Sequence, residues 1–188
     1  MSHPPDLPPI VSRAFDVCRR AGYVSFCRNE TGRLLATLAA TRAGTVAEFG
    51  TGCGVGTAWL RSGVPEGTRI LTAELDAKLA GSAQEIFADD DTVDVLAADW
   101  STLHDKGPFS LLFLDSGTPS AVGVDSIVDL IEPGGIVVLD DFTPCESWPP
   151  IFMGRVDTLR ESWLTDERFT AVEVMIAPDA SALIATRR

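Results

Sequence analysis

Five short apolar runs, each ending in a glycine loop or an acidic stretch, constrain the fold of this 188-residue chain more than any other feature. They read TVAEFG (45–50), RILTAEL (69–75), VDVLAAD (93–99), SLLFLDS (110–116) and GIVVLDD (135–141), and helix-like segments separate them. Near-continuous apolar strands are typical of a parallel sheet covered on both faces. Their alternation with helices predicts right-handed crossovers and a doubly wound, mostly parallel, Rossmann-like α/β sheet.

The segments on either side of this core also have a periodic pattern. Apolar spacing predicts helices over 10–22 and 29–44, with Asn29 or Thr31 as N-cap of the second. After residue 150 we expect a helix over 155–164 and then an antiparallel hairpin. The chain is therefore expected to be a single domain, with an N-terminal helical region (1–45) and an α/β core (46–188).

Composition excludes several classes of function. The net charge is −12 and only two residues are lysines, which argues against binding to nucleic acid or to anionic lipid. No apolar run approaches the roughly 18 residues of a membrane span, and the proline-rich start lacks the pattern of a secretory signal. The four cysteines are widely spaced, so free thiols in the cytoplasm are expected.

The ends of the predicted strands bring polar groups to one edge of the sheet. In a doubly wound sheet, ligands bind beyond the carboxyl ends of the strands, near the point where the strand order reverses. Each candidate strand contributes a loop or a carboxylate to that edge: Gly50–Gly56, Glu74, Asp99, Asp115 and Asp140.

The glycine-rich stretch VAEFGTGCGVGTAWL (46–60) predicts a loop that touches a nucleotide-type cofactor, since alternate glycines let a ligand approach the backbone. A phosphate-binding P-loop would end in Gly-Lys-Ser/Thr, but no lysine lies near Gly56-Thr57. A dinucleotide fingerprint requires G-x-G-x-x-G, and neither Gly50 nor Gly52 begins one. What stands here is Glu48-x-Gly50-x-Gly52-x-Gly54.

This motif resembles motif I of the class I S-adenosylmethionine-dependent methyltransferases, in particular the small O-methyltransferases of the catechol type. The similarity extends in order over about residues 30–142, through AAD (97–99), LFLD (112–115) and EPGGIVVLDD (132–141). It implies the class I methyltransferase fold and S-adenosylmethionine as cofactor. The implied cofactor-binding residues are Glu48, Gly50, Thr51, Gly52, Gly54, Glu74, Asp99, Trp100 and Asp115.

Individual roles follow from the same resemblance. Glu74 matches the acid that accepts hydrogen bonds from the ribose hydroxyls, and Asp76 is the less favoured acceptor at the start of the next helix. Asp99 matches the residue that meets the adenine amino group. Trp100 either stacks on adenine or fills the end of the sheet. Residues 29–31 either close over the methionine end of the cofactor, as a lid, or only cap a helix.

The catalytic residues are expected at Asp115 and Asp140. The resemblance implies that Asp115, Asp140 and Asp141 hold a divalent metal, with Asp141 in place of the family's asparagine. Oxygen-only ligation favours Mg²⁺ or Ca²⁺. In the alternative, the first two aspartates border the substrate pocket without metal and Asp141 caps a turn. Thr118 replaces the family's basic lysine. Either Asp115 or Asp140 would then take the proton, or the substrate would ionise without help, or the chain is a methyltransferase of a different subgroup; His104 is a less plausible base.

The segment DFTPCESWPPIFMGR (141–155) would wall the substrate pocket with an apolar cluster made of Trp148, Pro149, Pro150, Phe152 and Met153. An aromatic or apolar small molecule is therefore expected as methyl acceptor, and a second copy in a homodimer is one way to complete the pocket. The predicted function is methyl transfer from S-adenosylmethionine to an oxygen nucleophile. The alternative is a cofactor-binding protein of this fold without catalysis.

Overall fold

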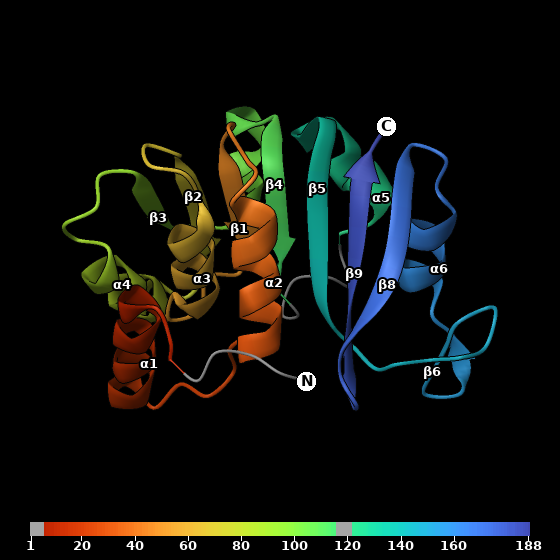
Figure 1. The fold of residues 1–188 in the computed structure, drawn as a ribbon, viewed down its shortest axis with the longest axis horizontal. Coiled ribbons are helices and arrows are strands. Elements are labelled where there is room, and N and C mark those ends of the chain that lie inside the picture. Colours follow the sequence, from red (N-terminus) through yellow and green to blue (C-terminus); the bar gives the residue numbers. More distant parts are fainter. Residues whose placement is uncertain (1–5, 116–121) are drawn as a thin grey trace.

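A computed structural model of the chain describes residues 6–115 and 122–188. Seven strands form one sheet in the order β3-β2-β1-β4-β5-β9-β8, and helices lie on both of its faces (Figure 1). The strands are β1 (Val46–Phe49), β2 (Ile70–Glu74), β3 (Val93–Ala97), β4 (Phe109–Leu114), β5 (Ile131–Phe142), β8 (Phe169–Ala177) and β9 (Ala180–Arg187). The helices are α1 (Pro9–Ala21), α2 (Asn29–Ala39), α3 (Val55–Gly63), α4 (Ala77–Ile86), α5 (Val124–Ile127) and α6 (Thr158–Thr165), with 3₁₀ turns η1 (Trp100–Lys106) and η3 (Val128–Leu130).

Strand directions agree with the predicted topology. The strands β1 to β5 pair in parallel, whereas β9 pairs antiparallel with both β5 and β8. The strand order reverses at β1, whose neighbours are β2 and β4, so the loop after β1 stands where a doubly wound sheet binds ligands. The predicted doubly wound sheet ending in an antiparallel hairpin, which is the class I methyltransferase fold, is confirmed.

Two hydrophobic cores lie on opposite faces of the sheet because side chains alternate along each strand. On β1, Val46 belongs to the core that α1, α2, α3 and α4 cover, while Ala47 and Phe49 belong to the core under η1, α5 and α6. All four residues of β1 are buried, as expected of a central strand. The acidic Glu48 is therefore the exception inside β1.

Some boundaries differ from the predictions. Helix α2 ends at Ala39, and its N-cap is Arg28, without a capping side-chain bond, so the expected cap at Asn29 or Thr31 is wrong. Strand β5 begins four residues before the predicted Gly135, at Ile131. The predicted helix over 155–164 forms from Thr158 only, because the residues before it pair in a two-stranded arm.

That arm was not predicted. It consists of β6 (Ile151–Phe152) and β7 (Arg155–Val156), and Met153 turns the chain between them with a φ of 50°. All residues from Ile151 to Val156 are exposed, so the arm reaches out beside the sheet, near the end of β8 (Figure 1).

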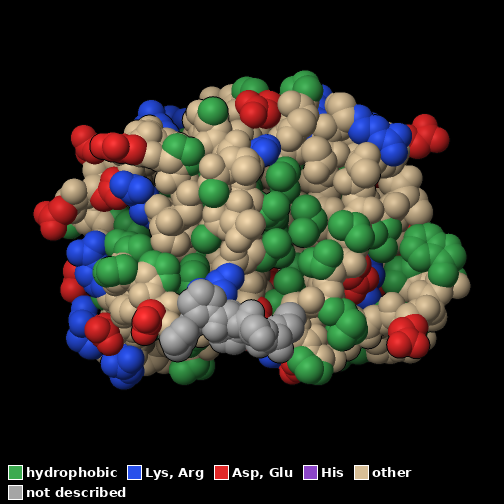
Figure 2. Space-filling model, viewed as in Figure 1, with side chains coloured by type: hydrophobic (Ala, Val, Ile, Leu, Met, Phe, Trp, Pro, Cys, Tyr) green, Lys and Arg blue, Asp and Glu red, His purple; other side chains and the backbone are tan. Residues whose placement is uncertain are grey.

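Charged and hydrophobic side chains are unevenly distributed over the molecular surface. Figure 2 shows charged side chains around the rim near α1 and α4 and hydrophobic side chains gathered over β5, β9 and β8. Val172 and Met175 on the edge strand β8 are among the exposed apolar residues. Of the helices formed by the described residues, none has the length and apolar character needed to cross a membrane.

Candidate active site

The loop after β1 is shaped by glycines in the left-handed conformation and is anchored to β2 by backbone hydrogen bonds. Gly50, Gly52 and Gly54 all have positive φ, between 52° and 94°, which only glycine adopts without strain. The amides of Gly50 and Thr51 donate to the carbonyl of Ala73 at 3.0 and 3.3 Å, so the loop is anchored to the neighbouring strand β2. The glycines at every second position therefore allow the turn that the sequence predicted.

Glu48 lies beneath this loop, fully buried. Its Oε2 accepts a hydrogen bond from the Thr72 hydroxyl at 2.7 Å and another from Thr57, while Oε1 has no hydrogen-bond partner among the described residues. Burial is the main cause that raises the pKa of Glu48 to about 8, and the two hydroxyl donors oppose it. The carboxyl is therefore mostly protonated at neutral pH and braces the loop from below.

Glu74, at the end of β2, faces the loop from its open side. Its carboxylate accepts hydrogen bonds from the backbone amides of Gly52 at 2.8 Å and Asp76 at 2.9 Å. Asp76 itself caps helix α4 by accepting from the amides of Lys78 and Leu79, as predicted for its structural role. Glu74 is thus fixed beside the glycine loop, where a ribose-binding acid of this fold is expected.

The third strand end carries Asp99 and Trp100. Asp99 is exposed, accepts from the amide of Ser101 at 2.9 Å, and has a lowered pKa chiefly because of the hydrogen bonds from Ser101. Trp100 stacks on Phe49 at 5.0 Å and lies 5.1 Å from His104, centroid to centroid. The indole therefore covers the end of the sheet, in line with the structural alternative, and its contact with adenine stays a prediction.

Two residues that sequence reasoning missed lie between α1 and α2. The hydroxyl of Tyr23 would stand 2.8 Å from a Cβ at Gly52, so this side chain packs directly on the glycine loop. Cys27 is buried, and its thiol pKa is raised by burial and then by the nearby charges of Asp115 and Asp140. No pattern in the sequence marks either residue, because neither belongs to a motif.

Thr31 and Asp140, which are 109 positions apart along the chain, are brought together in the fold. The Thr31 hydroxyl donates to Asp140 Oδ1 at 3.1 Å, whereas the buried Oδ2 has no hydrogen-bond partner in the described part of the chain. Burial is the first cause that raises the pKa of Asp140 to about 6. The chain just before Thr31 is also tied down by Arg28, which makes a bidentate pair with Asp179 at 2.9 and 3.0 Å.

The predicted metal ligands do not form a metal centre in this arrangement. Within residues 6–115 and 122–188, no group of three or more His, Cys, Asp or Glu side chains is placed to hold an ion. Asp115 follows β4, while Asp141 is exposed and has a positive φ of 64°. Thr118, which replaces the family's lysine, lies outside the described residues. We therefore assign no reaction step to a metal ion.

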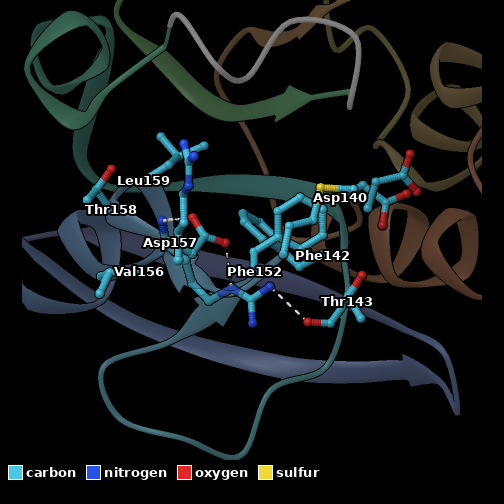
Figure 3. A pocket seen from close by; sticks show the side chains of 12 residues that line it. Asp140, Phe142, Thr143, Phe152, Val156, Asp157, Thr158 and Leu159 are labelled. Atoms are coloured by element: carbon cyan, nitrogen blue, oxygen red, sulfur yellow. Dashed lines mark hydrogen bonds and ion pairs between the residues drawn. The ribbon is translucent and has the colours of Figure 1, made fainter.

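A pocket of about 760 Å³ opens next to Asp140. Its lining comes from the end of β5, the arm and the start of α6: Asp140, Asp141, Phe142, Thr143, Phe152, Met153, Arg155, Val156, Asp157, Thr158, Leu159 and Arg160. Figure 3 shows Phe142 and Phe152 in the middle, with Asp140 to one side and Val156 and Leu159 to the other. Phe152 and Met153 line it as predicted, whereas Trp148 and the two following prolines do not.

Arg160 forms the charged floor of this pocket, and sequence reasoning missed it. The side chain is only 1% exposed and is ion-paired with Asp157 at 3.2 Å and Glu173 at 3.4 Å. It also donates to the carbonyl of Thr143 at 2.8 Å (dashed in Figure 3) and lies over the ring of Phe142 at 4.9 Å. The charge of Arg160 is therefore compensated by other residues of the protein, and these contacts join α6 to the sheet.

The comparisons with known proteins agree with this geometry. A family model described as a methyltransferase domain matches residues 47–142, which is half of the chain. The chain belongs to this methyltransferase family. The segment of this methyltransferase that the family model matches begins within β1 and ends at Phe142. It therefore includes the glycine loop, Glu74, Asp115 and Asp140. A search of curated protein sequences found no match.

Solved structures resemble the methyltransferase over almost its whole length. A putative O-methyltransferase from Klebsiella pneumoniae is 21% identical, with a TM-score of 0.75 over 98% of this chain and 92% of the other. The O-methyltransferase TomG from Streptomyces achromogenes, in complex with SAM, is 20% identical, with a TM-score of 0.76 over 97% and 92%. An O-methyltransferase from Bacillus cereus, in complex with SAH, is 18% identical, with a TM-score of 0.73 over 98% and 93%. At these identities the likeness establishes the shared fold.

Proposed function

We propose that this methyltransferase transfers a methyl group from S-adenosylmethionine to an oxygen atom of a small molecule. One observation carries the proposal: the glycine loop with Glu74, and the pocket bordered by Asp140, open at the same edge of one sheet. A cofactor on the loop and an acceptor in the pocket would therefore meet near Asp140. The solved O-methyltransferases of the same fold, two of them with SAM or SAH bound, support the choice of cofactor and acceptor atom.

Each residue has a role that its position allows. S-adenosylmethionine, when bound, supplies an electrophilic methyl carbon. The backbone amides of the loop and the carboxylate of Glu74 would hold and orient the ribose end, with Glu48 as the support below. The glycine residues, Thr51, Asp99 and Trp100 complete the proposed binding set, and the segment around Thr31 acts as its lid.

Asp140 is the proposed proton acceptor. Its Oδ2 is buried and without a hydrogen-bond partner among the described residues, while Thr31 holds Oδ1, so the free oxygen can take the proton of an acceptor hydroxyl. Asp115, which follows the neighbouring strand, is the second candidate. A carboxylate in this place offsets the missing lysine at Thr118.

Titration calorimetry with S-adenosylmethionine and S-adenosylhomocysteine tests the cofactor. We expect both to bind, and the absence of binding by either would reject the proposal. A screen for methyl transfer to phenols, catechols and small acids then tests the chemistry. Binding without turnover of any acceptor would favour a cofactor-binding protein that has lost catalysis.

The role of a divalent metal is a separate prediction. If Mg²⁺ or Ca²⁺ is needed, Asp115, Asp140 and Asp141 would have to be drawn together around it, and treatment with EDTA would abolish methyl transfer. Full turnover after chelation and dialysis would assign proton transfer to the carboxylates alone.

We also propose that the protein works in the cytoplasm and forms a homodimer. All four cysteines are free, which suits a reducing compartment. The exposed apolar residues Trp148, Phe152 and Met153 suit a contact with a second copy. Light scattering coupled to gel filtration would give the mass in solution, and a monomer at micromolar concentration would contradict the dimer.

A further inference from the structure

The arginines of this protein are almost all engaged by other groups. The chain carries 27 acidic residues and 15 basic ones, and the hydrogen bonds and ion pairs of the described residues occupy every arginine except Arg13 and Arg155. Both are exposed. Arg13 lies on helix α1, whereas Arg155 lies on the arm and lines the pocket. An unengaged guanidinium in the pocket of such an acidic protein requires an explanation.

The position of Arg155 is fixed by the pairing of the arm. Its register partner across the two strands is Phe152, and its neighbour in sequence is Val156. In Figure 3 these two residues lie on the far side of Phe142 from Asp140. The lining of the pocket therefore includes the carboxylate of Asp140, aromatic and aliphatic side chains, and the guanidinium of Arg155, which no described residue engages.

Charge elsewhere in the pocket limits where a charged ligand can bind. Arg160 is already paired with Asp157 and Glu173, so it attracts an anion only weakly. Asp140 and Asp141 would repel an anion at their own end. An anionic group can be accommodated only beside Arg155, whose planar fork of donors matches a carboxylate in a bidentate manner.

We infer that the acceptor is an aromatic hydroxy acid, whose carboxylate pairs with Arg155 while its hydroxyl faces Asp140. This inference rests on the proposed function and adds the substrate class. The ring would lie between Phe142 and Phe152, where apolar area is available for burial. Pairing at the remote end would hold the hydroxyl in line with the methyl donor, so Arg155 would select and orient the substrate without touching the reacting atoms.

Matched acceptors separate charge from shape. The probes are 3,4-dihydroxybenzoate with its neutral amide, and 3-(3,4-dihydroxyphenyl)propanoate with its neutral amide, so that two lengths are covered. For at least one length we expect the wild-type kcat/KM to favour the acid over the amide by about tenfold, a typical value for a charge-assisted pair. The preference should decrease as salt concentration rises.

Substitution of Arg155 then tests the residue itself. In Arg155→Ala the acid should lose its advantage, mostly through a higher KM, while the amide changes less than about twofold. Arg155→Lys should restore part of the preference and Arg155→Glu should reverse it. Arg13→Ala is the control, because it removes the other unengaged arginine at a site remote from the pocket.

Calorimetric titration of the four probes into protein saturated with S-adenosylhomocysteine gives the same comparison without turnover. If the wild type binds the acids more tightly than the amides and Arg155→Ala does not, the inference is supported. This holds even if no acceptor is methylated, and in that case only the proposed methyl transfer fails. Equal use or equal binding of acid and amide by the wild type, or an acid preference that survives Arg155→Ala, overturns it. Failure of all four probes to bind also overturns it.

Discussion

The two halves of the candidate active site are built in different ways. At the ends of β1 and β2, the proposed cofactor loop is held by contacts between two adjacent strands, such as the hydrogen bond from the Gly52 amide to Glu74, 22 positions away. At the end of β5, the proposed acceptor pocket is lined by residues between 140 and 160, but the carboxylate of Asp140 and the segment before α2 are held by partners far away along the chain. Thr31 reaches Asp140 across 109 positions, and Arg28 reaches Asp179 across 151.

This difference explains which part of the function could be recognised. A loop built from neighbouring residues leaves a motif with fixed spacing, which constrains the ligand that it binds. The lining of the pocket carries no motif of fixed spacing, and its shape depends on how the end of β5, the arm and α6 fold against one another. We therefore expect substitutions at the cofactor loop to act through the backbone and through stability, and substitutions at the pocket to act through the chemistry of single side chains.

The largest effect is expected on the pocket side, at Asp140. Asp140→Asn keeps the shape of the side chain but removes the proposed proton acceptor, so kcat should decrease by about 10²–10⁴-fold. Thr31→Val removes only the hydroxyl donor to Oδ1 and should cost far less. Initial rates under saturating cofactor measure both effects.

Thr31→Ser is the matched control, since it keeps the hydroxyl and should retain most of the activity. An Asp140→Asn variant with nearly wild-type kcat would remove Asp140 from the mechanism and leave Asp115 as the base.

On the cofactor side, Gly56→Ala should be severely destabilising. A Cβ at this position would overlap the Oε1 of Glu48, which lies in a fully buried network and cannot move away. Overpacking of this kind costs about 3 kcal/mol, so we expect a large decrease of the melting temperature.

Gly81→Ala in helix α4 is the matched control, because nothing lies within 4 Å of the added Cβ. It should stabilise the protein by about 0.5–1 kcal/mol. Equal melting temperatures for the two variants would mean that Glu48 does not brace the loop.

Glu74→Gln tests the hydrogen-bonding acid of the cofactor site. Loss of the charge should weaken binding of S-adenosylmethionine about 10–100-fold, since hydrogen bonds to charged groups contribute about 1.5–3 kcal/mol. Asp76→Asn, two residues further on, alters the cap of helix α4 and should leave the affinity within about threefold. Calorimetric titration measures both, and a larger loss in Asp76→Asn would reverse the assignment made from the sequence.

A further prediction concerns the pH dependence of stability through Glu48. The pKa of this carboxyl is about 8 in the folded protein and near 4.5 when solvent-exposed. The folded state therefore binds the proton more tightly, and the contribution of Glu48 to stability is complete below about pH 4.5 and is lost as pH rises towards 8.

Melting curves of wild type and Glu48→Gln between pH 5 and pH 9 check this sign. As pH increases, the melting temperature of the wild type should decrease relative to that of Glu48→Gln. A pH-independent difference would show that the carboxyl does not titrate in this range.

Much of the fold followed from local patterns. The five apolar runs became β1 to β5 because continuous apolar strands must be covered on both sides, and the terminal hairpin formed where alternation and a turn predicted it. The arm of β6 and β7 was missed because two-residue strands are too short to show a period. The caps of α2 were misplaced because no side chain bonds to its first turn.

The sequence by itself determined the sheet, the glycine loop and the acids at the strand ends, because these depend on neighbouring residues. Tertiary structure alone decided that Thr31 meets Asp140, that Tyr23 packs on Gly52, and that Arg160 is neutralised while Arg155 is not. The physical reason is that pairing between charges depends on distance in space, which the order of residues along the chain does not contain.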